Sequence, residues 1–368
     1  MSSSDEKKHI RVLCIDGGGM RGIYSAAYLH MMLSKYQKRR EIGDIDFGKS
    51  FDLICGTSTG AILACALAWG VELPKVISLY AKKGPFIFPA KVPGSLIRVI
   101  GQWFFRKRIN KSGADALQNA LDAELSGVRI RDVWEKRKIA LAIPAVEMSR
   151  HRAWVFKTPH LSNSKDRDGD YTLTQVCMAS TAAPVFRSMA WVPNNDNSGA
   201  HVFVDGGLWA NNPVLVGLID ALELTKRGDK IEIFCLGTCP PPSGDVITEE
   251  ADVHRGFGEW KLGSLAAGVG ISAQQYAYDN MARMLCRHVD RDLQIVRLPT
   301  GDVAAGLLEH LDLDETREAS MKALVGQAQT DAYEAFSIAG REDDRTGIAI
   351  NNLFMSAPER KKEGRGDV

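Results

Sequence analysis

The chain carries almost no net charge: 46 lysines and arginines against 45 aspartates and glutamates give a formal charge of +1. Binding along a nucleic acid polymer needs a concentrated basic face, so this balance does not support that class of function. The seven cysteines are odd in number and form no Cys-x-x-Cys pair, which argues against a disulfide framework or a zinc site. Unpaired cysteines are typical of a reducing compartment, and we therefore expect a cytoplasmic protein.

The sequence also lacks a clear secretory signal or membrane span. Residues Met1–His9 are polar and charged, and we expect a disordered N-terminus rather than a signal. The run Phe51–Val71 is apolar enough to suggest a membrane helix, but it contains Asp52 and the polar centre Gly56–Gly60. A buried strand, a turn and a helix explain this run better than a membrane span does.

What the sequence does contain is a Gly-x-Ser-x-Gly motif, Gly56–Gly60, between two apolar segments. We expect Phe51–Cys55 to form a buried strand and Ala61–Ala68 a helix packed on a sheet. A serine between two such elements lies on a sharp turn, where the flanking glycines avoid a clash of Cβ atoms. Ser58 is therefore a candidate nucleophile on a nucleophile elbow; the alternative is a structural turn.

A glycine run at the start of a predicted helix supplies a second feature. Asp16–Gly22 follows the strand-like segment Ile10–Ile15 and opens a helix expected over Met20–Lys38. Amides in this position have no intrahelical partner and lie at the positive end of the helix dipole, so they can bind negative charge. In an acyl-transfer reaction that charge is the oxyanion of the tetrahedral intermediate, so the glycine run is a candidate oxyanion hole.

The same glycines satisfy the dinucleotide-binding pattern Gly-x-Gly-x-x-Gly. Acidic residues follow about where such an enzyme binds ribose: Glu41, Asp44 and Asp46. A dinucleotide-binding oxidoreductase therefore stays as an alternative, although it leaves the serine motif and Asp16 unexplained. A phosphate-binding P-loop is not supported, because no Gly-Lys-Ser/Thr ending follows the glycines.

A serine nucleophile needs a neighbouring base. Asp205 and two glycines follow the predicted strand His201–Val204, which would direct the acid into the crevice of an α/β sheet; a turn aspartate is the alternative. None of the eight histidines lies in a setting that resembles a triad histidine loop: His9, His30, His151, His160, His201, His254, His288 and His310. Burial would raise the pKa of an aspartate from its ordinary value of about 3.9, so a Ser58–Asp205 dyad is favoured.

These three motifs, in this order, resemble the patatin-like phospholipase family. Ala179–Pro184 and Asn211–Pro213 are also similar to the segments that precede and follow the Asp-Gly-Gly motif of that family. The resemblance covers about residues 10–240. It implies an α/β fold, a patatin-like three-layer sandwich whose mainly parallel sheet has helices on both faces.

By position, the resemblance implies that Ser58 is acylated, that Asp205 is its base and that Gly17–Gly19 form the oxyanion hole, with no metal or organic cofactor. The implied substrate is a membrane glycerophospholipid, cleaved at the inner face of the cell membrane by a peripherally bound enzyme. An unregulated lysophospholipase or a soluble esterase is the alternative. Two roles are open to Arg21: contact with a lipid phosphate, or, as we favour, an ion pair with a carboxylate at a helix end.

The remaining segments extend the α/β pattern. Strands are predicted over Lys138–Val146, Ala153–Thr158 and Ile231–Leu236, and a helix over Pro213–Lys226. The catalytic domain is expected to span 10–240, and 241–340 to be an extension packed on it. In that extension we predict a helix, a strand and a helix: Trp260–His288, Asp292–Leu298 and Asp314–Ala339. Residues 341–368 are expected to form a charged tail that is disordered from Pro358.

One segment departs from the alternation. Residues 82–111 contain prolines, glycines and aromatic residues flanked by Arg and Lys, and we expect an irregular insertion there. Such insertions often act as lids or binding loops, and rings beside cations suit a membrane interface. The alternative is that the rings belong to the core.

A phospholipase that acts freely in the cytoplasm would endanger its own cell, so we expect regulation. The segment Asp16–Ala26 and the C-terminal extension resemble the bacterial anti-phage effector phospholipases that cyclic dinucleotides switch on. This resemblance implies a cyclic di- or trinucleotide activator, although no motif reveals its binding residues. The extension and the 82–111 insertion would then rearrange to free the site. The sequence leaves the oligomeric state open, and a homo-oligomer is one option.

Overall fold

The computed structural model of the chain describes residues 7–91, 96–194, 199–239, 247–256, 260, 264–299, 303 and 305–361, without the side chains of 96–104, 251–252, 264, 267 and 305. Its strands form one eight-stranded sheet in the order β5-β6-β3-β2-β1-β7-β8, with β4 paired to β3. The strands are β1 (His9–Ile15), β2 (Leu53–Gly56), β3 (Ala140–Glu147), β4 (Arg152–Lys157), β5 (Ala190–Pro193), β6 (Ala200–Asp205), β7 (Lys230–Leu236) and β8 (Asp292–Leu298).

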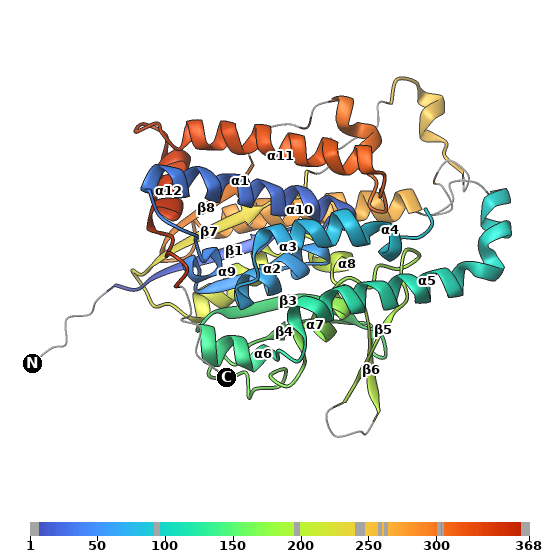
Figure 1. Ribbon diagram of the computed structural model, residues 1–368, viewed down its shortest axis with the longest axis horizontal. Coiled ribbons are helices and arrows are strands. Elements are labelled where there is room, and N and C mark those ends of the chain that lie inside the picture. Colours follow the sequence, from blue (N-terminus) through green and yellow to red (C-terminus); the bar gives the residue numbers. More distant parts are fainter. Residues whose placement is uncertain are drawn as a thin grey trace, which may run out of the picture.

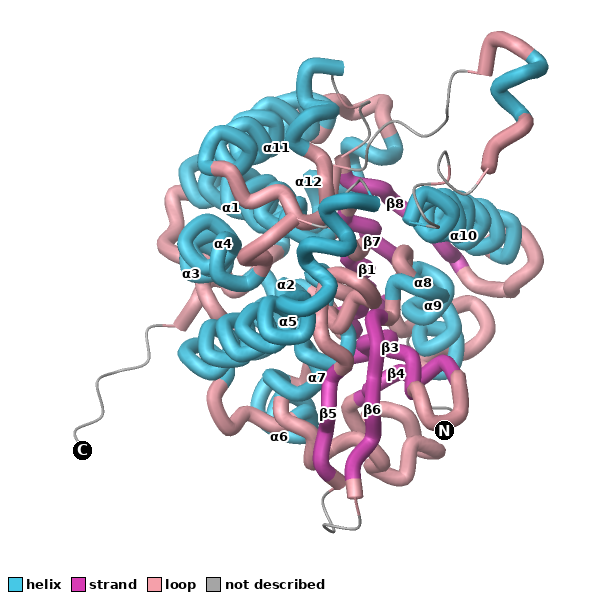
Figure 2. The backbone as a smooth tube through the Cα atoms, turned by 90° about the vertical axis from the view of Figure 1, so that its right-hand side faces the viewer, coloured by secondary structure: helices cyan, strands magenta, loops and turns pink. Residues whose placement is uncertain are grey.

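Helices cover both faces of this sheet and make three layers, as Figure 2 shows. One layer contains α1 (Gly22–Arg40), α2 (Thr59–Trp69), α3 (Leu73–Ser78), α4 (Gly84–Ile87), α5 (Leu96–Leu125), α6 (Ile130–Asp132), α7 (Leu173–Ser180), α11 (Glu318–Ile338) and α12 (Arg345–Ser356). The other contains α8 (Gly207–Ala210), α9 (Val214–Glu223) and α10 (Ser264–Leu285). Strands β1, β2, β3, β7 and β8 are parallel, whereas β4, β5 and β6 pair antiparallel. The predicted three-layer α/β sandwich is therefore confirmed.

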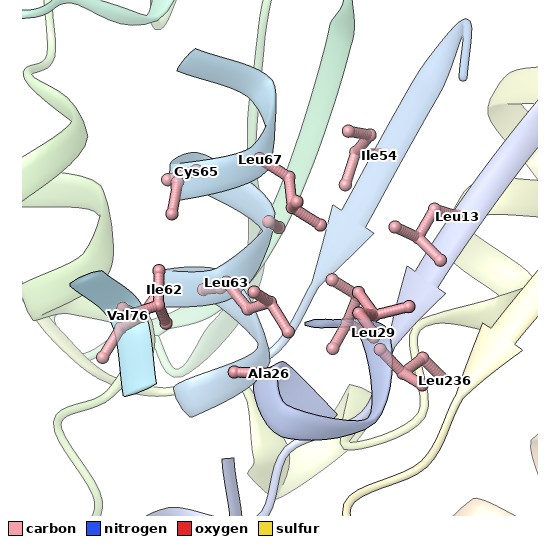
Figure 3. Packing of buried hydrophobic residues seen from close by; sticks show 14 of the residues in the cluster. Leu13, Ala26, Leu29, Ile54, Ile62, Leu63, Cys65, Leu67, Val76 and Leu236 are labelled. Atoms are coloured by element: carbon pink, nitrogen blue, oxygen red, sulfur yellow. The ribbon is translucent and has the colours of Figure 1, made fainter. Parts of the chain in front are cut away.

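Helix α2 lies at the centre of the larger core. Residues Thr59–Ala68 are all buried, as expected of a helix that is apolar on every side. Figure 3 shows Leu63 and Leu67 between α2 and the strands, near Ile54 of β2. Burying such a leucine contributes about 1.5–3 kcal/mol, so the helix that follows Ser58 is firmly fixed.

The region after residue 240 completes the sheet and one helical layer. β8 pairs with β7 in parallel along its whole length, which confirms the predicted strand Asp292–Leu298. The predicted helices Trp260–His288 and Asp314–Ala339 are confirmed as α10 and α11, each with shorter ends. Helix α11 lies along α1 (Figure 1).

The N-terminal boundary differs from the expectation that residues 1–9 are disordered. His9 is already part of β1, and the Lys8 amide donates to Asp229 Oδ1 at 3.0 Å. The cause is the sheet itself, because β1 pairs with β7 from His9 onward. Residues 1–6 lie outside the described part of the chain.

The charged tail expected over 341–368 contains helix α12. The charged composition of the tail does not predict this helix, because α12 is a short amphipathic segment with charged residues on both sides. Its residues Leu353 and Phe354 are fully buried. The chain also stays ordered beyond Pro358, since Glu359 forms an isolated antiparallel bridge with Ile45. The disorder predicted from Pro358 is therefore wrong for residues 358–361, and residues 362–368 lie outside the described part.

The insertion over residues 82–111 is helical rather than irregular where the structure describes it. It contains α4 and the beginning of the 30-residue helix α5, whose last turns are rich in alanine and leucine. Ile87 is buried, whereas Phe86 and Phe105 are exposed, so a core role and a surface role each describe part of the segment. Residues 92–95 and the side chains of 96–104 lie outside the described part, and the lid prediction stays untested there.

We predict that Phe354→Ala lowers the free energy of unfolding by about 3–5 kcal/mol, measured by urea denaturation, because it leaves a cavity where two rings stack on Phe354. The ring centroids of Tyr36 and Phe47 lie 5.1 and 4.9 Å from that of Phe354. Met355→Ala, next along the chain and partly exposed, is the control and should change the stability by less than about 0.5 kcal/mol. Equal small effects would mean that α12 does not stabilise the domain.

Candidate active site

Ser58 lies on the sharp turn between β2 and α2. Its backbone angles, φ 55° and ψ −126°, fall in a region that residues with a Cβ atom rarely adopt. The flanking glycines permit this turn, because a Cβ on Gly56 would clash with Gly60 O and a Cβ on Gly60 would clash with Ile15 O. The buried helix α2 therefore holds a strained backbone that presents Ser58 at its N-terminus.

Two strands end head-on along one edge of β3. β2 pairs with Ala140–Ala142 in parallel, and β6 pairs with Ala145–Glu147 antiparallel. Because β4 pairs with Ala142–Glu147 along the other edge, β2 and β6 must share an edge and point toward each other. Asp205 is the last residue of β6, so this arrangement brings its carboxylate to the turn that follows β2.

The structure places Ser58 and Asp205 in direct contact. Ser58 Oγ donates to Asp205 Oδ2 at 2.6 Å, and the Gly207 amide donates to the other carboxylate oxygen at 2.7 Å. Ser180 fixes the backbone of Ser58. Its Oγ accepts a hydrogen bond from the Ser58 amide at 3.0 Å and donates one to Pro144 O at 2.7 Å. Both oxygens of the carboxylate are thus oriented, with one aimed at the serine hydroxyl.

The carboxyl group of Asp205 has a raised pKa. Burial raises its pKa from 3.8 to about 6, against the opposing effects of the hydrogen bonds from Ser58 and Gly207 and the positive charge of Arg187. A base works best when its pKa lies near the operating pH. Asp205 is therefore ionised above pH 6, yet basic enough to accept a proton from a serine.

The hydrogen bonds of the glycine loop reduce the number of amides that are free to bind an oxyanion. The Gly17 amide already donates to Asn211 O at 2.9 Å, so the expectation that Gly17 binds an oxyanion does not fit this structure. The Gly18 amide has only a long contact of 3.3 Å to Thr59 Oγ1. The Gly19 amide has no hydrogen-bond partner among the described residues. Gly18 and Gly19 remain the candidates.

Arg21 lies behind this loop with its side chain buried. Its Nε donates to Gly18 O at 3.2 Å and its Nη1 to Cys239 O at 3.4 Å. Burial lowers the pKa of its guanidinium to about 10. The favoured ion pair with a helix-end carboxylate is therefore wrong for the described residues, since Arg21 supports the carbonyl side of the loop instead.

Asp16, the acid before the glycines, also has a structural partner. Arg297 of β8 donates to Asp16 Oδ2 at 2.8 Å and to Asp279 of α10 at 3.0 Å. Burial raises the pKa of Asp16, and the charge of Arg297 opposes this. The ion pairs connect the glycine loop to both the last strand and α10.

The alternatives to the dyad find no support in the geometry. No histidine among the described residues hydrogen-bonds to Ser58 or Asp205, and the buried His160 lies instead against Asp220, with 3.2 Å between His160 Nε2 and Asp220 Oδ2.

The dinucleotide-binding alternative expected three acids to bind ribose. One of them, Asp46, accepts hydrogen bonds from both Nη atoms of Arg137, at 2.7 and 2.8 Å. It is therefore committed to a structural ion pair.

Sequence reasoning missed several residues that build this site. Ser180 lies in the Ala/Ser-rich segment and Asn211 follows the Asp-Gly-Gly motif, so their neighbourhoods were recognised but their contacts were not. Arg187, also buried, influences Asp205 electrostatically. Only its short distance in sequence from Pro184 could have drawn attention to it.

The described residues show neither a membrane-spanning helix nor a metal-binding cluster. No described helix is both long enough and apolar enough to cross a membrane. The residues of the described part include no group of three or more His, Cys, Asp or Glu side chains suited to hold a metal ion.

Comparison with known proteins gives a consistent result. A family model described as patatin-like phospholipase matches residues 13–218. The chain is 32% identical to the cGAMP-activated phospholipase of Pseudomonas aeruginosa, over 74% of each chain. It is 31% identical to proteins of the same name from Vibrio cholerae and Escherichia coli, over 90% and 91% of this chain and 92% of each relative. The chain therefore belongs to the patatin-like phospholipase family and is a hydrolase.

Proposed function

We propose that this phospholipase cleaves ester bonds of membrane glycerophospholipids through a Ser58–Asp205 dyad and an acyl-enzyme. The observation that carries the proposal is the 2.6 Å hydrogen bond from Ser58 Oγ to Asp205 Oδ2. Asp205 removes the hydroxyl proton while Ser58 Oγ bonds to the ester carbonyl carbon, and the amides of Gly18 and Gly19 stabilise the oxyanion.

Collapse of the tetrahedral intermediate completes the first half of the reaction. The ester C–O bond breaks, and the lysolipid alkoxide takes the proton from Asp205. Water then attacks the acyl-enzyme, Asp205 accepts a proton from that water, and Ser58 recovers a proton as the fatty acid leaves. The pKa of about 6 suits Asp205 to both tasks, since the same group acts as base and then as acid.

A cyclic nucleotide activator, acting in anti-phage defence, belongs to the same proposal. Its first support is that the relatives similar over most of the chain are named cGAMP-activated phospholipases. The second support is burial: Ser58 is 9% exposed and Asp205 5%. A rearrangement that exposes these two side chains to a bilayer lipid would be one way for the nucleotide to activate the enzyme.

The segment Leu311–Arg317 is the part we propose to move. Leu313 O accepts from the Met20 amide at 2.9 Å, and a Cβ on Gly19 would clash with Leu313 O, so this segment lies directly on the glycine loop. Glu315 fixes it through Lys91 at 2.6 Å and Arg317 at 2.9 Å. The extension 241–340 and the insertion 82–111 thereby meet beside the candidate oxyanion donors.

Contact with the inner face of the cell membrane is proposed through exposed rings near basic residues. Phe86 follows Lys82 and Lys83, and Phe105 precedes Arg106 and a further lysine. Rings that enter the acyl boundary and cations that meet anionic headgroups strengthen peripheral binding.

We expect Ser58→Ala and Asp205→Asn each to lower fatty-acid release from phospholipid vesicles by at least about 10³-fold, because each removes a group that acts in bond making. Release is measured in the presence of cGAMP by titrating free fatty acid. Asp343→Asn, at an exposed site, is the control and should keep wild-type activity. Release that persists in Ser58→Ala would overturn the acyl-enzyme mechanism.

The activity should rise with pH through a midpoint near 6. The carboxylate of Asp205 is the reactive form, and its pKa is raised to about 6, so kcat/KM falls roughly tenfold per pH unit below that value and levels off above it. The measurement is kcat/KM on a soluble short-chain phospholipid from pH 4.5 to 8. A profile that is flat across pH 5–7 contradicts the assignment of Asp205 as base.

Addition of cGAMP to vesicles of phosphatidylethanolamine and phosphatidylglycerol should increase fatty-acid release by about tenfold or more, corresponding to a coupling free energy of at least about 1.4 kcal/mol. A panel of other cyclic di- and trinucleotides tests the specificity, and Ser58→Ala with cGAMP controls for contaminating lipase. Equal release with and without every nucleotide would contradict gating while leaving the hydrolase intact.

A further inference from the structure

One buried cation beside the candidate dyad has no partner among the residues that the structure describes. Arg187 is 7% exposed, and no described residue offers its guanidinium a hydrogen bond or an ion pair; Nε is fully buried and unsatisfied. Asp205 is near enough to influence it electrostatically but not to pair with it. Burying a cation without a partner is costly, so an unpaired arginine calls for an explanation.

Other arginines whose side chains are buried or partly buried have partners among the described residues. Arg21 donates to two carbonyls, Arg137 binds Asp46 through two nitrogens, and Arg297 bridges two carboxylates. Arg187 therefore differs from its peers in the one place where a substrate must bind. An anionic group supplied by a ligand would complete it.

The backbone fixes Arg187 at the site. The Asp205 amide donates to Ala182 O at 3.1 Å, and the Arg187 amide donates to Ala183 O at 2.9 Å, so the segment that carries Arg187 begins on the strand end that carries the candidate base. Burial lowers the pKa of Arg187 only to about 10, so the group stays cationic at neutral pH.

Three exposed apolar side chains lie close to Arg187 or Asp205 in the chain, and we call them the apolar rim. Val185 and Met189 flank Arg187 by two residues on each side, and Leu208 follows Asp205 by three; all three are exposed. Arg106, the neighbour of the exposed Phe105, donates to Val185 O at 3.0 Å and brings α5 beside them. A buried cation that the chain carries next to this apolar rim matches an amphiphile with one phosphate and long acyl chains.

We propose that Arg187 binds the phosphodiester of the lipid substrate and makes the site select phosphorus-containing glycerolipids over neutral glycerol esters. This inference rests on the proposed lipid hydrolysis and deepens it. A guanidinium presents a planar fork of donors that matches two phosphate oxygens, and such charge-assisted bonds are among the strongest in proteins. The apolar rim favours a lipid over a cyclic nucleotide as the source of the phosphodiester.

The test compares two substrates that share one acyl ester: 1-palmitoyl lysophosphatidylcholine and 1-palmitoylglycerol, in mixed micelles with cGAMP. Arg187→Gln should lower kcat/KM for the lysophospholipid by about 10- to 100-fold and that for the neutral ester by less than about threefold. Arg187→Lys should retain part of the preference. Arg341→Gln, at an exposed arginine, is the control and should change neither value.

An equal loss on both substrates would overturn the proposal, because Arg187 would then act only through Asp205. A raised cGAMP concentration for half-activation, with unchanged substrate preference, would also overturn it and assign the phosphodiester to the nucleotide. If the wild type hydrolyses neither ester, the proposed hydrolysis fails instead. In that case the role of Arg187 is tested by binding alone, with a diether phosphatidylcholine that cannot be hydrolysed. Weaker binding by the double variant Ser58→Ala/Arg187→Gln than by Ser58→Ala supports the proposal, and equal binding overturns it.

Discussion

The meeting of β2 and β6 along one edge of β3 is the constraint on which the candidate site depends. A parallel and an antiparallel strand end head-on there, so their C-terminal residues face each other across a short gap. Pro144 of β3 lies opposite this gap, and its carbonyl accepts from Ser180, which in turn holds the Ser58 amide. The 2.6 Å contact between Ser58 and Asp205 follows from backbone pairing rather than from side-chain adjustment.

Burial gives this site its electrostatic character. Desolvation raises the pKa of Asp205 to about 6, and it disfavours any buried charge that has no partner. Other buried charges near the site have ion pairs or hydrogen bonds. Asp16 is matched by Arg297, and Asp205 by two hydrogen bonds. The Arg187 guanidinium, by contrast, has no ion pair or hydrogen bond among the described residues, which is why a ligand phosphate is a reasonable complement to it.

The glycine loop beside the candidate dyad is connected to the C-terminal part of the chain. Leu313 lies on the glycine loop, Arg297 ties Asp16 to α10, and β8 extends the sheet beside β7. The elements after residue 240 are thus positioned to alter the glycine loop without forming any part of the dyad. A ligand that binds a second state of this region more tightly would shift the population toward an open site.

The motifs, their order and most of the elements that carry them could be predicted from the sequence alone. Ser58 between a buried strand and a buried helix, and Asp205 at a strand end, were predictable because local patterning fixes where strands stop and helices begin. Helix α12 was not predictable, since its few apolar residues acquire meaning only against distant rings such as Tyr36. Two features became visible in the folded chain alone: the Gly17 amide donates to Asn211 O, and the Arg187 guanidinium has no partner among the described residues. Both depend on how strands and loops from distant parts of the chain come together, which local sequence patterns do not show.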